Sequence, residues 1–263
     1  LFDLGATGVE ERDEGTLARG KPGMTTLVAS FDSEKDARAA QKKLGKSARV
    51  EELVGDAWRD AWKEHFKPFR LCEGLWVRPP WQDHAPRRGE KVLVLEPGRA
   101  FGTGLHETTR LVAAAISMMR RTLPQTTVLD VGTGSGILAL TALALGAKSA
   151  AGVDNDADAI EVAKENAERN GMSDRMTFST TPIARVHGTF GLVLANIEAD
   201  VLVAMKTALR ARLALGERLV LSGILASREA DVRAAFGKPI ERAELRSATD
   251  DDAWVALTYT KTT

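Results

Sequence analysis

The fold of this chain is decided by the stretch Val128-Leu129-Asp130-Val131-Gly132-Thr133-Gly134-Ser135-Gly136-Ile137-Leu138. An apolar run ends in an acid, three glycines follow at alternate positions, and the apolar pattern of a helix then begins. A second apolar run ends in another acid, Asp154, twenty-two residues after Gly132. This order predicts a strand, a glycine turn, a helix and a second strand, which together form half of a nucleotide-binding site.

The spacing of the glycines bears on the type of ligand. Glycines let the backbone come close to a ligand, the helix start offers free N–H groups, and the second acid can accept hydrogen bonds from ribose hydroxyls. A dinucleotide site requires G-x-G-x-x-G, whereas Ile137 follows Gly136 here and the pattern is G-x-G-x-G. The pattern therefore resembles motif I of the S-adenosylmethionine (SAM)-dependent methyltransferases. An NAD site and a tight turn without a ligand are the alternatives at this point.

Composition sets broad limits on the function. The chain has 263 residues, with 36 basic and 36 acidic side chains, so no net charge attracts nucleic acid. No apolar run approaches a membrane span and no signal peptide is visible, which predicts no membrane partner. The single cysteine, Cys72, excludes an internal disulfide and is typical of a cytoplasmic protein. The four histidines are scattered, and we predict no metal site.

The sequence divides into three segments. Residues 1–54 predict a small α+β domain, with a strand at 25–31 and a helix that begins after Ser33. The first residues are typical of a helix end, so we expect part of this domain to be missing at its N-terminus. Residues 55–68 predict a linker helix with an aromatic stripe, and residues 69–263 form the main domain.

Strands and helices alternate in the main domain. Helices are predicted at 107–121, 135–145, 201–215 and 228–236, a further helix ends near Asn170, and strands are predicted at 75–81, 91–95, 128–131, 150–153, 190–195, 218–221 and 254–260. This alternation predicts an α/β fold with a mostly parallel sheet. Ligands of such sheets bind beyond the carboxyl ends of the strands, which brings Gly132, Asp154 and Asn196 to one edge. In the helix at 107–121, Leu111, Ala115, Met118 and Met119 are expected in the core.

A second group of motifs is more selective. Residues 101–109 read Phe-Gly-Thr-Gly-Leu-His-Glu-Thr-Thr, Asn196-Ile197 follows an apolar run, and Ser-Gly-Ile-Leu occupies residues 222–225. Over residues 56–263 the chain resembles the PrmA family, the bacterial methyltransferases of large-subunit ribosomal protein eleven. The resemblance implies a Rossmann-like SAM-methyltransferase sheet with a small N-terminal α+β domain of ferredoxin-like type.

The resemblance also implies site residues and a cofactor, SAM. The cofactor-binding residues would be Phe101, Gly102, Thr103, Thr109, Gly132, Gly134, Asp154 and Asn196. Asn196 is expected to orient the attacking amine. His106 is a candidate general base, with backbone hydrogen bonding as the alternative role.

The residues after the fourth strand indicate the class of acceptor. Residues 196–199 read Asn-Ile-Glu-Ala and lack the Pro-Pro-aromatic platform on which planar amides and bases stack. This favours an aliphatic amine. The resemblance implies methylation of lysine and/or N-terminal amines of ribosomal protein eleven by a cytoplasmic monomer, without nucleic acid. The alternatives are lysines of another protein, such as an electron-transfer flavoprotein subunit, an NAD-dependent oxidoreductase, and a non-catalytic module with a vestigial site.

Overall fold

The computed structural model describes residues 1–12, 26–31, 33–50, 66–96, 104–246 and 252–262. The chain divides into two compact units, Leu1–Lys67 and Pro68–Thr263. Residues 51–65, which include most of the helix predicted at 55–68, fall outside the described residues. The linker helix therefore stays a prediction.

The described residues of the first unit form a strand pair and a helix. Strand β1 (Gly8–Arg12) pairs antiparallel with β2 (Thr26–Ser30), and α1 (Glu34–Leu44) follows, with short 3-10 turns at Phe2–Leu4 and Gly45–Ser47. The Ser33 hydroxyl accepts a hydrogen bond from the Asp36 N–H at 3.1 Å and caps the helix, as the sequence predicts. Strand β1 was not predicted, because its Gly-Val-Glu-Glu-Arg sequence has no apolar alternation.

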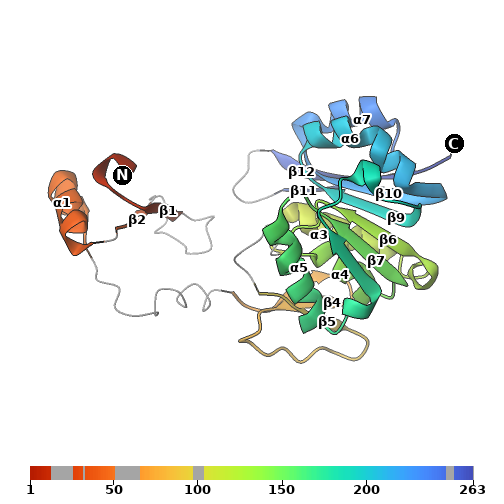
Figure 1. Ribbon diagram of the computed structural model, residues 1–263, viewed down its shortest axis with the longest axis horizontal. Coiled ribbons are helices and arrows are strands. Elements are labelled where there is room, and N and C mark those ends of the chain that lie inside the picture. The colour runs from red at the N-terminus through yellow and green to blue at the C-terminus, as the bar shows by residue number, and fades with distance from the viewer. Residues whose placement is uncertain (13–25, 32, 51–65, 97–103, 247–251, 263) are drawn as a thin grey trace. The chain divides into compact units, whose positions relative to one another are not determined.

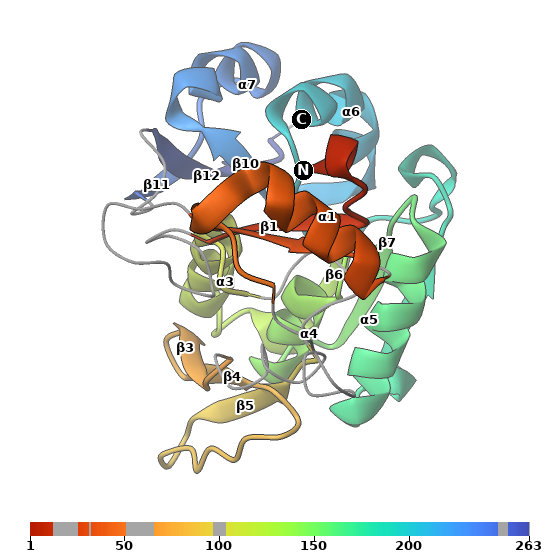
Figure 2. The same ribbon diagram turned by 90° about the vertical axis from the view of Figure 1, so that its left-hand side faces the viewer.

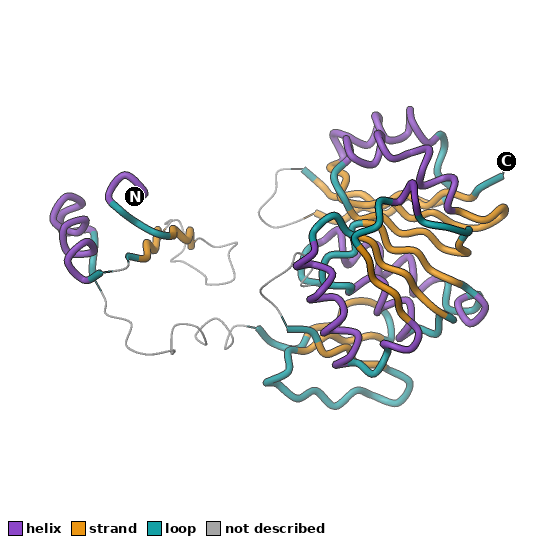
Figure 3. Tube along the Cα trace, in the orientation of Figure 1, coloured by secondary structure: helices purple, strands orange, loops and turns teal. Residues whose placement is uncertain are grey.

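The second unit is built on a seven-stranded sheet in its described part, with the strand order β11-β12-β10-β9-β6-β7-β8. The strands are β6 (Thr127–Val131), β7 (Ser149–Val153), β8 (Met176–Ser179), β9 (Phe190–Asn196), β10 (Leu213–Leu225), β11 (Glu241–Arg246) and β12 (Ala253–Thr260). The pairs from β8 to β10 are parallel, and β12 and β11 are added antiparallel at one edge. Figure 3 shows these strands between layers of helices. The predicted mostly parallel sheet is confirmed.

Helices cover both faces of this sheet. They are α3 (Glu107–Met118), α4 (Ile137–Ala144), α5 (Ala157–Arg169), α6 (Ala199–Arg212) and α7 (Glu229–Phe236), with 3-10 turns at Leu123–Gln125, Ser173–Arg175, Ile183–Arg185 and Ala226–Arg228. Helices α3, α4 and α5 lie on one face, whereas α6 and α7 lie on the other (Figure 1). A smaller sheet of β3 (Phe69–Cys72), β4 (Leu75–Arg78) and β5 (Lys91–Val94) packs near α3 and α4 (Figure 2).

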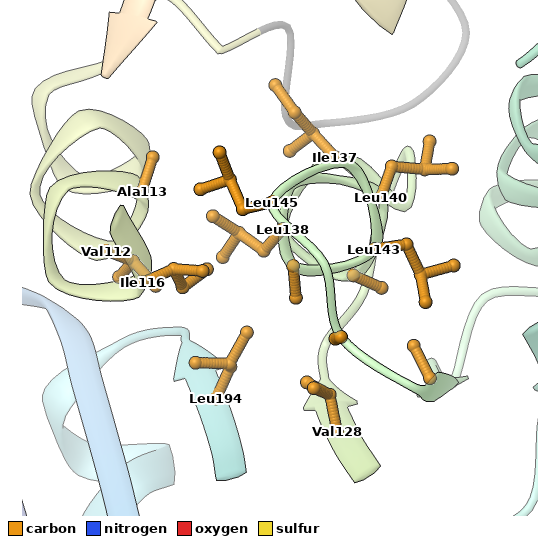
Figure 4. Close-up of a cluster of buried hydrophobic side chains, with 14 of the residues drawn as sticks. Val112, Ala113, Ile116, Val128, Ile137, Leu138, Leu140, Leu143, Leu145 and Leu194 are labelled. Atoms are coloured by element: carbon orange, nitrogen blue, oxygen red, sulfur yellow. The ribbon is translucent and has the colours of Figure 1, made fainter. Parts of the chain in front are cut away.

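The core on the α3 side is centred on α4. This helix is apolar nearly all round and is buried almost throughout, as its sequence predicts. Figure 4 shows its side chains pointing in several directions, toward Val112 and Ile116 of α3 and toward Leu194 of β9. Burying one such side chain contributes about 1.5–3 kcal/mol, so this packing anchors the start of α4 and the glycine turn before it.

Two local predictions were wrong. The helix predicted at 201–215 ends at Arg212, because Leu213 begins β10, and Leu215 is 70% exposed. Met118 is not in the core but 72% exposed. It lies two residues after the fully buried Ile116, and 3.6 residues per turn place it on the far side of the helix.

Candidate functional site

The strand register brings the predicted site residues together at one edge of the sheet. Val131 of β6 is paired with Val153 of β7 and with Ala195 of β9. The residue after each of these three is, in the same order, Gly132, Asp154 and Asn196. All three strands are parallel, so these residues lie side by side at the carboxyl edge, as predicted.

The first glycine of the turn is required by a close approach. Gly132 has a φ of 71°, which L side chains rarely adopt, and a Cβ there would lie 2.5 Å from Cγ2 of Ile197. Its N–H donates to the Val153 carbonyl at 2.8 Å. The turn is therefore packed between β7 on one side and Ile197 on the other.

Asp154 connects the glycine turn to the end of β7. Its Oδ2 accepts a hydrogen bond from the Gly134 N–H at 2.9 Å, and its Oδ1 accepts one from the Asp156 N–H at 3.1 Å. A carboxylate has about four lone-pair positions, so both oxygens retain capacity for hydroxyl donors. The side chain is only partly buried, and it can therefore bind a ribose while it holds the turn.

Asp130, the acid before the turn, is fully buried. Its Oδ2 accepts hydrogen bonds from the Thr133 hydroxyl at 2.8 Å and from the Ala139 N–H at 3.2 Å. Burial, with the nearby charge of Asp154, raises the pKa of Asp130 to about 6. The sequence identified this acid only as part of the motif, and the structure shows that it ties the turn to the start of α4.

Two further predicted residues each have a buried oxygen without a partner in the described part of the chain. Oδ1 of Asn196 and Oγ1 of Thr109, in the first turn of α3, are buried and have no hydrogen-bond partner among the described residues. Because side chains alternate along a strand, Asn196 lies on the same face as Leu194, which packs in the α3–α4 core. A buried polar atom without a partner costs about 1–3 kcal/mol. Both oxygens therefore fit a ligand with polar groups, as a SAM site requires.

The position of Asn196 is set by its neighbour, Ile197. The Ile197 N–H donates to the Ser222 carbonyl at 3.1 Å, which extends the β9–β10 pairing. Gly223 has a φ of 82°, and a Cβ there would lie 2.4 Å from the Ile197 carbonyl oxygen. Ile197 is thus enclosed between Gly132 and Gly223. The sequence contains both motifs, Asn196-Ile197 and residues 222–225, but does not reveal the contact between them. The signal that could have indicated it is Gly223, because a glycine in a strand often marks a close approach of another backbone.

His106 begins helix α3 as its N-cap. Its Nδ1 accepts a hydrogen bond from the Thr108 N–H at 3.3 Å and lies 2.9 Å from the Thr108 hydroxyl. The ring also meets Trp254 edge to face, with centroids 4.9 Å apart. An Nδ1 that accepts an amide proton leaves the hydrogen of the neutral ring on Nε2. The backbone role considered from the sequence is therefore present, and the base role stays a prediction.

The predicted residues Phe101, Gly102 and Thr103 lie outside the described residues. Within the described ranges, no group of His, Cys, Asp and Glu side chains could hold a metal ion. None of the helices described there is both long and apolar enough to span a bilayer.

Comparison with known proteins identifies the family. A family model described as "Ribosomal protein L11 methyltransferase (PrmA)" matches residues 13–262. The chain belongs to the PrmA family. A ribosomal protein L11 methyltransferase of Sorangium cellulosum is 52% identical over 256 residues, which cover 94% of this chain and 81% of that protein. The protein of the same name from Myxococcus xanthus is 38% identical over 267 residues, which cover 98% and 91%.

Solved structures agree with this assignment. The crystal structure of a ribosomal protein L11 methylase from Lactobacillus delbrueckii subsp. bulgaricus superposes with a TM-score of 0.67 at 30% identity. The superposition covers 75% of this chain and 100% of the Lactobacillus chain. The PrmA resemblance, the Rossmann-like methyltransferase fold and the expectation of a SAM-dependent methyltransferase are therefore confirmed. The oxidoreductase and flavoprotein-subunit alternatives are not favoured.

Proposed function

We propose that this PrmA-family protein transfers methyl groups from SAM to lysine and/or N-terminal amines of ribosomal protein L11. The observation that carries the proposal is the convergence of Asp154, the glycine turn and the two unpaired oxygens of Asn196 and Thr109 at one edge of the sheet. The relatives named for L11 supply the substrate. Because the substrate is a ribosomal protein, we expect a cytoplasmic monomer that needs no nucleic acid.

The predicted cofactor residues would contact different parts of SAM. Asp154 accepts hydrogen bonds from the ribose hydroxyls, and the backbone at Gly132 and Gly134 allows the ligand to lie close. Asn196 and Thr109 supply further oxygen acceptors. When bound, SAM would supply a methyl group activated by its bond to a sulfonium, with S-adenosylhomocysteine as the leaving group when an amine takes the methyl. The protein's main tasks are therefore alignment and the exclusion of water.

The acceptor amine must lose its proton before it attacks. A free lysine has a pKa of about 10.4 and an α-amine one of about 7.7–8.0. An apolar mouth to the site would disfavour an ammonium and so promote the neutral form. The Asn196 oxygen can accept an N–H of the amine and direct its lone pair. His106 is the candidate that receives a proton, and to do so its Nδ1 must release the hydrogen bond from the Thr108 N–H.

The proposal is tested with purified L11. We expect calorimetry to detect SAM binding, and mass spectrometry to detect additional methyl groups on amines of L11. Asp154→Ala should weaken SAM binding sharply, whereas Glu161→Gln, on the exposed side of α5, should not. If the protein binds SAM but does not methylate L11, L11 is not its substrate. If it does not bind SAM, SAM is not its cofactor.

Residues 1–54 are the proposed substrate-recognition domain. Their strand pair and helix contain none of the predicted cofactor residues. A variant that starts after residue 54 should therefore bind SAM as the full chain does and fail to methylate L11. Equal methylation by the two proteins would refute this role.

A further inference from the structure

Helix α5 carries a buried amide that contacts the glycine turn. Asn166 is 1% exposed, and its Nδ2 donates a hydrogen bond to the Ser135 carbonyl at 2.9 Å. Ser135 lies between the second and third glycines of the motif. Asparagine is a weaker helix former than alanine, and burying its amide is costly without partners. The role of Asn166 is therefore explained by its hydrogen bond to the glycine turn rather than by helix stability.

The orientation of this amide is set by a second pair of residues. Oδ1 of Asn166 accepts a hydrogen bond from Nη1 of Arg169 at 2.8 Å. Nη2 of Arg169 in turn binds Oε2 of Glu96 at 2.8 Å. A guanidinium only donates, so the amide oxygen must face Arg169 and the amide nitrogen must face Ser135.

The glycine turn is consequently held from two directions. Asp154 binds the Gly134 N–H, and Asn166 binds the Ser135 carbonyl. A turn made largely of glycine has few side chains with which to fix its own conformation, so outside partners must do so. We infer that Asn166, oriented by Arg169 and Glu96, is a positioning residue that holds the Ser135 peptide in the conformation that binds SAM. This inference rests on the proposed function.

The sharpest test is Asn166→Asp. The carboxylate keeps the shape of the amide and an acceptor for Arg169, but it loses the donor and presents an oxygen to the Ser135 carbonyl. We expect the Kd for SAM, measured by calorimetry, to rise at least tenfold. Because the effect acts through the turn, kcat at saturating SAM should change less than KM for SAM.

Asn170→Asp is the matched control. Asn170 lies one turn further along, and its Nδ2 donates to the Val94 carbonyl of β5 at 2.8 Å and to the Asn166 backbone carbonyl at 2.7 Å, neither of which belongs to the glycine turn. The same substitution there removes these two hydrogen bonds but leaves the Asn166 side chain and its bond to Ser135 in place, so it should lower the Tm without raising the Kd for SAM. If Asn170→Asp raises the Kd as much as Asn166→Asp does, general loosening of α5 explains the effect and the inference is wrong.

Arg169→Met keeps the inference testable if Asn166→Asp does not fold. It leaves the amide in place but removes the group that orients it, so the Kd for SAM should rise about threefold, and Arg169→Lys should recover part of the loss. A wild-type protein that binds SAM, with Arg169→Met and Asn166→Asp binding equally well, overturns the inference and leaves the proposed function standing. A wild-type protein that does not bind SAM overturns the proposed function itself.

Discussion

Gly223→Ala is the substitution whose effect the structure defines most closely. The added Cβ would lie 2.4 Å from the Ile197 carbonyl oxygen, 2.7 Å from its carbon and 2.9 Å from its nitrogen. All three are backbone atoms, so no side-chain rotation can relieve the overlap. Ordinary contact begins at 3.4 Å, and Ile197 or the end of β10 must therefore move by about 1 Å. Ile197 directly follows Asn196, so the proposed amine-orienting oxygen moves with it.

Two costs follow from this geometry. A φ of 82° costs a non-glycine residue about 1–2 kcal/mol, which lowers the free energy of unfolding. A displacement of about 1 Å at a catalytic group can reduce the rate about 100-fold, which is about 2.7 kcal/mol in the activation free energy. We expect kcat for L11 methylation to fall by about that factor, with the Tm lowered by several degrees.

Gly216→Ala separates the two costs. Gly216 lies on the same strand with a φ of 80°, but a Cβ there would meet nothing within 4 Å. This variant should lose similar stability and retain full kcat, both measured below the Tm of the less stable protein. If Gly223→Ala and Gly216→Ala have the same kcat, Ile197 does not position Asn196 and the reasoning about this contact is refuted.

Three further outcomes follow from buried groups. Burial raises the pKa of Asp130 from 3.8 to about 6, so the folded state binds the carboxyl proton more tightly than the unfolded state does. This proton binding adds to the free energy of unfolding below pH 3.8, and the contribution is lost as the pH rises through about 6. At about 1.4 kcal/mol per pKa unit, the free energy of unfolding of the wild type should fall by about 2.4 kcal/mol relative to Asp130→Asn between pH 4 and 7, as urea titrations can measure. Burial also raises the pKa of the Cys72 thiol to about 11, so a thiol reagent at pH 8 should label the native protein far more slowly than the urea-unfolded one; equal rates would contradict its buried placement. Thr109→Val, which keeps the shape of the side chain but removes the hydroxyl, should raise the Kd for SAM several-fold with little change in Tm, and an unchanged Kd would remove Thr109 from the site.

The fold was predictable wherever one strong local pattern was present. The apolar helix between Gly136 and Gly146 and the strands on either side of it appear where the sequence places them. The boundary at Arg212 was missed because leucines continue from α6 into β10, and apolar residues alone do not distinguish the two states. Strand β11 was missed because its sequence, Glu-Arg-Ala-Glu-Leu-Arg, is charged and lies at the sheet edge, where pairing with β12 is sufficient to hold it.

The site shows a different limit. Gly132, Asp154 and Asn196 could be found from the sequence because each follows an apolar run, and the rule for parallel sheets then places them at one edge. The contacts that hold these residues in place join segments distant in sequence, such as Asn166 with the backbone of Ser135 and Gly223 with that of Ile197. Every residue type has the same backbone atoms. A residue that is contacted only through its backbone, such as Ser135 or Ile197, therefore cannot be recognised from its residue type. An asparagine in a helix, or a glycine at a strand end, gains its meaning only from the peptide group opposite it. For this reason the ligand-facing residues of a methyltransferase can be identified from motifs, whereas the residues that support them have to be found in the structure.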